Sequence, residues 1–246
     1  MALFRTSNPA LNEKAFRTQA ALGDAMTVQG TVNKTGVLLL CVVVTSAWTW
    51  GLAHSETPDA VLPWMLGGLI GGLIVAMVTI FKKEWSALTA PLYALLEGLV
   101  LGGISALFER SYPGIAVQAV GLTFGVLFVM LVAYKTGVIQ ATEKFKIGVI
   151  AATGGIALLY RVEMVLGFFH VQVPLINQSG PIGIAFSVFV VIIAALNLVL
   201  DFDMIETGAR IGAAKYMEWY GAFGLMVTLI WLYLEILRLL AKARRR

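Results

Sequence analysis

The sequence predicts an all-α integral membrane protein, folded as a bundle of seven transmembrane helices. Hydrophobic residues make up 59% of the 246 residues and charged residues only 13%, and the mean hydropathy is +0.86. Soluble domains carry about 25% charged residues. Seven apolar runs come close to the length of roughly 20 residues that a helix needs to cross the hydrocarbon core. These runs cover residues 34–53, 60–81, 87–108, 113–134, 147–169, 181–201 and 219–241.

The connectors between these runs are short, which predicts one bundle without a separate soluble domain. We expect a polar cytoplasmic tail over 1–33, the transmembrane domain over 34–241 and a basic tail over 242–246. Within the first tail, Asn8-Pro9 suits a turn before a short helix from Ala10 to Leu22, although a loosely ordered tail fits equally well. The first apolar run begins too late for an ordinary cleaved signal peptide, so this tail is expected to stay in place.

Basic residues predict the orientation, because Lys and Arg are enriched in cytoplasmic loops. The N-terminal tail and alternate connectors are rich in them, so we expect a multi-pass protein of the bacterial inner (plasma) membrane with a cytoplasmic N-terminus. Seven full spans, which we favour, would place the basic C-terminal tail outside. That tail then either is an exception to the rule or marks an incompletely crossing last segment. The residues that set the orientation are Arg5, Lys14, Arg17, Lys34, Lys82, Lys83, Lys135, Lys144, Lys146, Arg210 and Lys215.

Several function classes lack the residues that they need. A single cysteine, Cys41, excludes an intrachain disulfide, and with only His54 and His170 the chain offers no usual metal or thiol centre. Ser105 has no plausible histidine partner, and the Gly-x-Gly-Asp motif of aspartyl intramembrane proteases is missing. The last span has no lysine before Lys242 for a retinal Schiff base. We therefore expect no enzyme, no cofactor and no nucleic-acid partner, and a lipid bilayer as the surroundings.

Glycines at four-residue spacing predict close helix packing. The second span places Gly67 four residues from Gly71 and Gly68 four residues from Gly72. The third span repeats the spacing with Gly98 and Gly102. We expect the second and third spans to pack tightly within the bundle.

Ionisable residues inside the spans are the functional candidates, because a charge at the bilayer centre costs at least about 2.5–3.5 kcal/mol. Asp201 and Asp203 close the sixth run, two residues apart, so they point about 200° from each other and only one can face the core. Asp203 and Glu206 share a face if the helix continues. For Asp201 and Glu206 the simpler interpretation is a solvated helix end.

Three further positions belong to this set. Glu97 has no basic residue within a helical turn, so it needs a partner on another helix, a proton or water. Glu235 and Arg238 are three residues apart, which allows a local ion pair with Arg238 reaching the interface. Arg161 is a basic group well inside a span, and we expect it to act as a counter-ion for the acids.

The motifs VLDFDMIETGA (199–209) and WLYLEILRLLAK (231–242) resemble the Bax inhibitor-like (TMBIM) family. NPALNEKAF (8–16) and MTVQGTVNKTG (26–36) resemble a bacterial branch of it, and the resemblance covers essentially the whole chain. It implies a seven-helix bundle whose last helix lies near the centre. It also implies one of two activities: a pH-sensitive calcium leak, or the regulation of cell death or membrane proteolysis.

The resemblance implies a hydrogen-bonded pair of carboxyls on the last two helices. Asp203 after Phe202, and Glu235 after Leu-Tyr-Leu, match the two positions. Glu235 stands where the family commonly has Asp, and the second span lacks the arginine that holds the pair in calcium-leaking members. Two close carboxyls at low dielectric would share a proton, and their oxygens are ligands that calcium prefers. We therefore expect Asp203 and Glu235 to form a pH switch and a calcium site, with Glu97 as a further acid on the cation path.

The sequence leaves three functions open. The first is the pH-sensitive cation (calcium) leak just described, with calcium or protons as the moving ions. The second is a non-transporting regulator that binds other membrane proteins or a membrane protease. The third is a proton-coupled transporter of a small solute, which is less favoured because no pair of broken helices marks corresponding halves of the chain.

Overall fold

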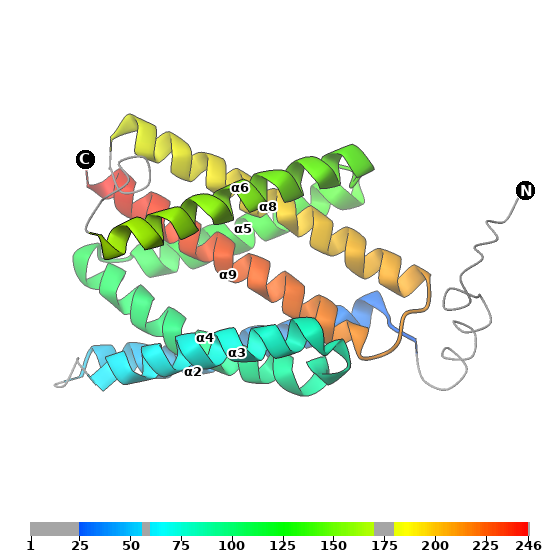
Figure 1. Ribbon diagram of the computed structural model, residues 1–246, viewed down its shortest axis with the longest axis horizontal. Helices are drawn as coiled ribbons and strands as arrows, with labels where there is room; N and C mark the ends of the chain where they lie inside the picture. Colours follow the sequence, from blue (N-terminus) through cyan, green and yellow to red (C-terminus); the bar gives the residue numbers. More distant parts are fainter. Residues whose placement is uncertain (1–24, 56–59, 170–179, 246) are drawn as a thin grey trace, which may run out of the picture.

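The computed structural model describes residues 25–55, 60–169 and 180–245, and within them seven helices are long and apolar enough to cross a membrane (Figure 1). The seven-span prediction is therefore confirmed. The short helix expected over 10–22 lies outside the described residues. The helices are α2 (Val28–Ala53), α3 (Val61–Phe81), α4 (Ser86–Ser111), α5 (Ile115–Lys135), α6 (Glu143–Phe168), α8 (Pro181–Arg210) and α9 (Met217–Arg244), with a short 3-10 turn, η3 (Lys83–Trp85), before α4.

Two helices extend six residues or more beyond the apolar runs because local chemistry supports them. α2 begins six residues early, at Val28, where the side chain of the N-cap residue Thr27 accepts a hydrogen bond from Gly30 N. α8 continues to Arg210 and ends at a turn in which Gly212 has a φ of 67°. That left-handed conformation suits glycine. The acids at 201, 203 and 206 therefore lie within α8 and not beyond its end.

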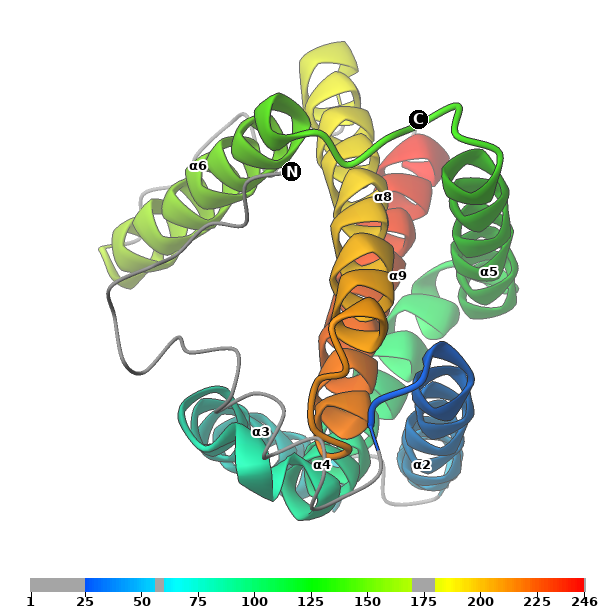
Figure 2. The same ribbon diagram turned by 90° about the vertical axis from the view of Figure 1, so that its right-hand side faces the viewer.

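Helix α9 runs through the middle of the bundle (Figure 2). It packs against α2, α4, α5 and α8, and its Met226, Leu232 and Leu237 are completely or almost completely buried. Half of its most apolar stretch is buried within the protein. The central position expected for the last helix is confirmed.

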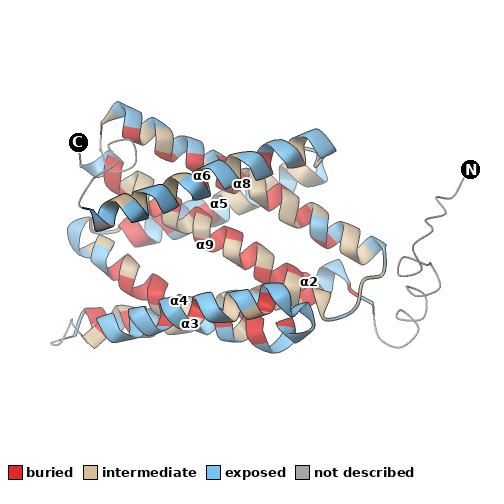
Figure 3. Cartoon of the chain, in the orientation of Figure 1, coloured by how far each residue is buried: buried red, intermediate tan, exposed pale blue. Residues whose placement is uncertain are grey.

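Helices α3 and α6 lie at the periphery, each held mainly by one neighbour, α4 and α8 respectively. Only 17% of the most apolar stretch of α3 and 11% of that of α6 is buried. Figure 3 shows their outer faces largely exposed, and these faces carry apolar side chains such as Leu73 and Met164. Apolar residues on an outer surface suit a bilayer, where the lipid tails are the solvent.

The glycine spacing marks real contacts between helices. A Cβ built on Gly68 would lie 2.5 Å from Leu96 O of α4, whereas one on the adjacent Gly67 would meet nothing within 4 Å. The second and third spans, α3 and α4, therefore pack closely as expected. Gly98 and Gly102 serve a different interface, since both face α2, where Ser46 Oγ donates to Gly98 O at 2.9 Å.

Gly68→Val should destabilise the protein because the new side chain would overlap the backbone of α4. Overpacking of this kind costs about 1–3 kcal/mol. Gly67→Val is the matched control, the same change one residue away on an open face, and should leave the thermal midpoint in detergent almost unaltered. Equal midpoints for the two variants would contradict the α3–α4 contact.

Candidate functional site: the carboxyls around the central helix

The acid of α8 that faces the bundle interior is Asp201. Its Oδ2 atom is buried and, among the described residues, has no hydrogen-bond partner. Thr228 of α9 is close enough to hydrogen-bond with the carboxyl, and a Cβ on Gly224 would lie 3.9 Å from Asp201 Oδ1. The interpretation of Asp201 as a solvated helix end is therefore wrong, because α8 continues for more than two turns beyond it.

Asp203 faces α6 and not the core. Its Oδ2 lies 2.9 Å from the Lys146 ammonium, which also contacts Glu143 at 3.3 Å. The side chain of Asp203 is 23% exposed. A lysine near the start of α6 therefore neutralises this carboxylate.

Glu235 is 2% exposed and is enclosed by donors. The Tyr160 hydroxyl of α6 donates to both carboxylate oxygens at 3.0 and 3.1 Å, and Trp231 Nε1 donates at 3.3 Å. Arg238 Nη1 lies 3.1 Å from Oε1 and also donates to the Tyr160 hydroxyl at 2.7 Å. The local ion pair of Glu235 with Arg238 is confirmed, and it leaves this carboxylate fully satisfied.

The structure does not bring Asp203 and Glu235 together. α8 and α9 form an antiparallel hairpin in which a Cβ on Gly221 would meet Ile205, while Lys242 Nζ donates to Ser187 Oγ at 2.8 Å near the other end. Asp203 is therefore level with the region around residue 224, eleven residues before Glu235. At 1.5 Å per residue the two acids are roughly 16 Å apart along the axis. This separation contradicts the expected proton-sharing pair and the calcium site that the pair would form.

Among the described residues, the remaining candidates form no hydrogen bond or ion pair with Asp203 or Glu235. Glu97 faces α3, where a Cβ on Gly72 would lie 3.4 Å from its Oε2, and it hydrogen-bonds with Tyr93 one turn earlier. Glu206 is exposed and accepts a hydrogen bond from the Tyr134 hydroxyl at 2.8 Å. Arg161 has an exposed side chain on α6, so its expected role as counter-ion for the interior acids is wrong.

An ion cluster that the sequence did not reveal holds the first turn of α9. Glu218 is completely buried and accepts from Thr27 N at 2.8 Å and from Thr27 Oγ1 at 2.9 Å. It also pairs with Lys34 and, at 3.2 Å, with Lys215. Gly30 leaves the room for this carboxylate. Because 191 residues separate Thr27 from Glu218, no spacing rule connects them.

The described residues contain no group of three or more His, Cys, Asp or Glu side chains placed to hold a metal ion. The carboxyls are instead distributed around α9. Glu218 and Glu235 lie on α9 itself, Asp201 and Asp203 on α8, and Glu97 on α4. Asp201 differs from Asp203, Glu218 and Glu235 because each of these three has a lysine or arginine partner.

The chain matches a protein-family model over almost its full length. Residues 8–245 match the family model described as "Bax inhibitor 1 like", which covers essentially the whole chain. Neither the curated proteins nor the solved structures give a match.

Glu218→Gln should lower stability, because the neutral amide cannot replace the buried carboxylate that accepts from Thr27 and pairs with Lys34 and Lys215. Hydrogen bonds to a charged group contribute about 1.5–3 kcal/mol. The control is Glu143→Gln, because the Glu143 side chain is 85% exposed. The thermal midpoint of this variant should hardly differ from that of the wild type. The measurement is thermal unfolding in detergent, and similar midpoints for both variants would show that the cluster contributes little.

Proposed function

The chain belongs to the Bax inhibitor 1-like family of multi-pass membrane proteins, and from that premise we propose that it is a pH-sensitive cation (calcium) leak pathway. We place it in the bacterial plasma membrane with its N-terminus in the cytoplasm. The observation that carries the proposal is the buried Asp201 carboxyl, whose Oδ2 has no hydrogen-bond partner among the described residues. In this proposal Asp201 takes the pH-sensing role that the sequence pattern suggested for Asp203.

Asp201 suits this role because none of the ion pairs among the described residues includes it. A carboxylate inside a membrane bundle must be protonated, paired with a cation or reached by water. The Thr228 hydroxyl can donate a hydrogen bond to the carboxyl, and Oδ2 has no partner among the described residues. Carboxylate oxygens are the ligands that calcium prefers, so a deprotonated Asp201 would attract a divalent cation.

Glu97 supplies a second acid at a similar depth. Tyr93 of α4 packs on Phe223 of α9 at 5.1 Å between ring centroids, and Ser105 of α4 meets the Tyr233 hydroxyl at 2.6 Å. α4 therefore runs parallel to α9, and Glu97 lies near the level of residues 226–228, as Asp201 does. The two acids therefore lie at a similar depth on α4 and α8, with the Glu97 side chain beside Gly72 of α3.

The proposed pH response has a definite sign. Burial at low dielectric favours the protonated, neutral form of Asp201, which lets α8 and α9 stay in contact. At higher pH the carboxylate needs water or a cation, and α8 separates from α9. Leak should therefore rise with pH and fall on acidification. In this proposal Lys146 of α6 keeps Asp203 paired and away from the cation path. It takes the place of the arginine that the second span lacks.

Asp201→Asn should abolish the pH dependence of the leak, because the amide keeps the shape but cannot ionise. The measurement is calcium uptake by liposomes containing the purified protein, over a pH series from acidic to mildly alkaline. The wild type should leak faster at the alkaline end than at the acidic end, because a larger fraction of Asp201 has lost its proton there. Asp203→Asn, two residues away, should keep the pH dependence. A flat wild-type profile, or loss of the response in Asp203→Asn alone, would contradict the assignment.

A non-transporting regulator is the second candidate, favoured by the uncovered faces of α3 and α6. Only 17% and 11% of their most apolar stretches are buried, so a partner membrane protein could dock there as readily as lipid. If this is the function, purified protein will give no calcium flux at any pH. It will then co-purify from native membranes with a membrane protease or another membrane protein. Flux without a bound partner would exclude it.

A further inference from the structure

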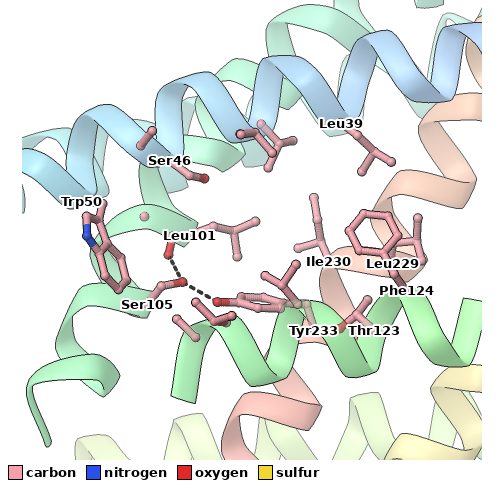
Figure 4. A pocket seen from close by; sticks show the side chains of 17 residues that line it. Leu39, Ser46, Trp50, Leu101, Ser105, Thr123, Phe124, Leu229, Ile230 and Tyr233 are labelled. Atoms are coloured by element: carbon pink, nitrogen blue, oxygen red, sulfur yellow. Dashed lines mark hydrogen bonds between the residues drawn. The ribbon is translucent and has the colours of Figure 1, made fainter. Parts of the chain in front are cut away.

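A pocket of about 490 Å³ lies between α2, α4, α5 and α9, away from the carboxyls described above (Figure 4). Its volume falls in the range of roughly 300–1,000 Å³ that is usual for ligand sites. The walls are predominantly apolar and include Leu39 of α2, Leu101 of α4, Phe124 of α5 and Ile230 of α9.

The few hydroxyls in the wall are already used within the protein. Ser46 Oγ donates to Gly98 O at 2.9 Å, and Thr123 Oγ1 donates to Ala119 O at 2.7 Å. Ser105 Oγ lies 2.6 Å from both Leu101 O and the Tyr233 hydroxyl (Figure 4). A polar ligand would find little to bond with, so the pocket suits a hydrocarbon.

The pocket opens sideways between α2 and α5. Val43 on α2 is 61% exposed, and Val117 and Val120 on α5 are 77% and 45% exposed, yet all three line the pocket. Because both helices span the membrane, this opening faces lipid tails and not bulk water. Lipid is therefore the molecule present at the opening.

Arginine side chains lie at the end of the bundle where α2 ends and α5 begins, next to one end of the pocket. Arg110 donates to Ala53 O, one turn beyond the pocket residue Trp50 of α2. Arg244 donates to Pro113 O at 2.8 Å and to Gln118 Oε1 at 2.9 Å, beside the pocket residues of the first turns of α5.

Arg245 adds a third guanidinium, whose Nε donates to the Tyr112 hydroxyl at 2.9 Å. The nearby carboxylate of Glu109 already accepts from the backbone N–H groups of Gly114 and Ala116. Among the described residues, the hydrogen bonds of these arginines go to neutral groups, so their charge is available to an anion. Guanidinium groups bind phosphate oxygens with paired hydrogen bonds.

We propose that this pocket holds one acyl chain of an anionic phospholipid, whose phosphate is bound by Arg110, Arg244 and Arg245. The proposal is independent of the leak activity. It also gives Arg244 and Arg245 of the basic C-terminal tail a role in binding headgroups at the membrane surface.

The test uses the full-length protein purified with phosphatidylglycerol or phosphatidylcholine of the same chain length and examined by native mass spectrometry. We expect one retained lipid per chain, with phosphatidylglycerol preferred by about tenfold. Val120→Trp should reduce retention of both lipids by a similar factor, because the indole would occupy the opening. Val43→Trp on the opposite lip should do the same, which guards against one variant failing to fold.

Val132→Trp is the matched control, on the same helix and with a parent side chain 44% exposed against 45% for Val120, but outside the pocket. It should retain lipid as the wild type does. Arg244→Gln combined with Arg245→Gln should keep one bound lipid but lose the preference for phosphatidylglycerol, whereas Arg161→Gln on α6 should not.

Three results would overturn the proposal. One is equal lipid retention by Val120→Trp, Val43→Trp and Val132→Trp. Another is unchanged headgroup preference in the double arginine variant. The third is a stable dimer that the two lip variants dissociate without any change in bound lipid, because a second copy would then be the occupant.

Discussion

The ion cluster at Glu218 ties the central helix to the rest of the bundle. Its carboxylate joins the first turn of α9 to Thr27 and Lys34 at the start of α2, and this end is also held by a hydrogen bond from Met26 N to Ala213 O at 2.7 Å. Because α9 packs against four other helices, its depth and rotation determine which side chain each neighbour meets. The positions of Thr228 beside Asp201, and of Glu235 beside Tyr160, follow from that placement.

The low dielectric of the membrane explains why the carboxyls differ. An unpaired buried charge is expensive, and three of the five carboxyls around α9 have a basic partner. Asp203 has Lys146, Glu235 has Arg238, and Glu218 has two lysines. Among the described residues Asp201 has only the Thr228 hydroxyl as a polar partner, so ionisation of this carboxyl would require water, a cation or a movement of the helices. That difference, and not the mere presence of acids, separates a candidate sensor from a structural ion pair.

One segment of α9 lies between the Asp201 carboxyl and the apolar pocket. Thr228 faces Asp201 on α8, while the next two residues, Leu229 and Ile230, line the apolar pocket. Adjacent residues on a helix point about 100° apart, so a single turn of α9 contacts both the carboxyl and the pocket contents. A lipid bound in the pocket, as proposed, would therefore contact the same turn of the central helix that Asp201 faces.

The sequence by itself determined the membrane class, the seven spans and the close approach of α3 to α4, because these depend on composition, length and local spacing. It also identified the ion pair of Glu235 with Arg238, whose partners are three residues apart. Helical spacing correctly showed that Asp201 and Asp203 cannot both face the core. It could not tell which one does, because that depends on how α8 is rotated against α9 and α6.

Only the tertiary structure decided the contacts between distant residues. The separation of Asp203 from Glu235 follows from the register of the α8–α9 hairpin, and the Glu218 cluster joins residues 191 positions apart. The exposure of Arg161 follows from the peripheral position of α6. In each case the partner is set by the depth and rotation of packed helices, which residue spacing along one helix does not encode.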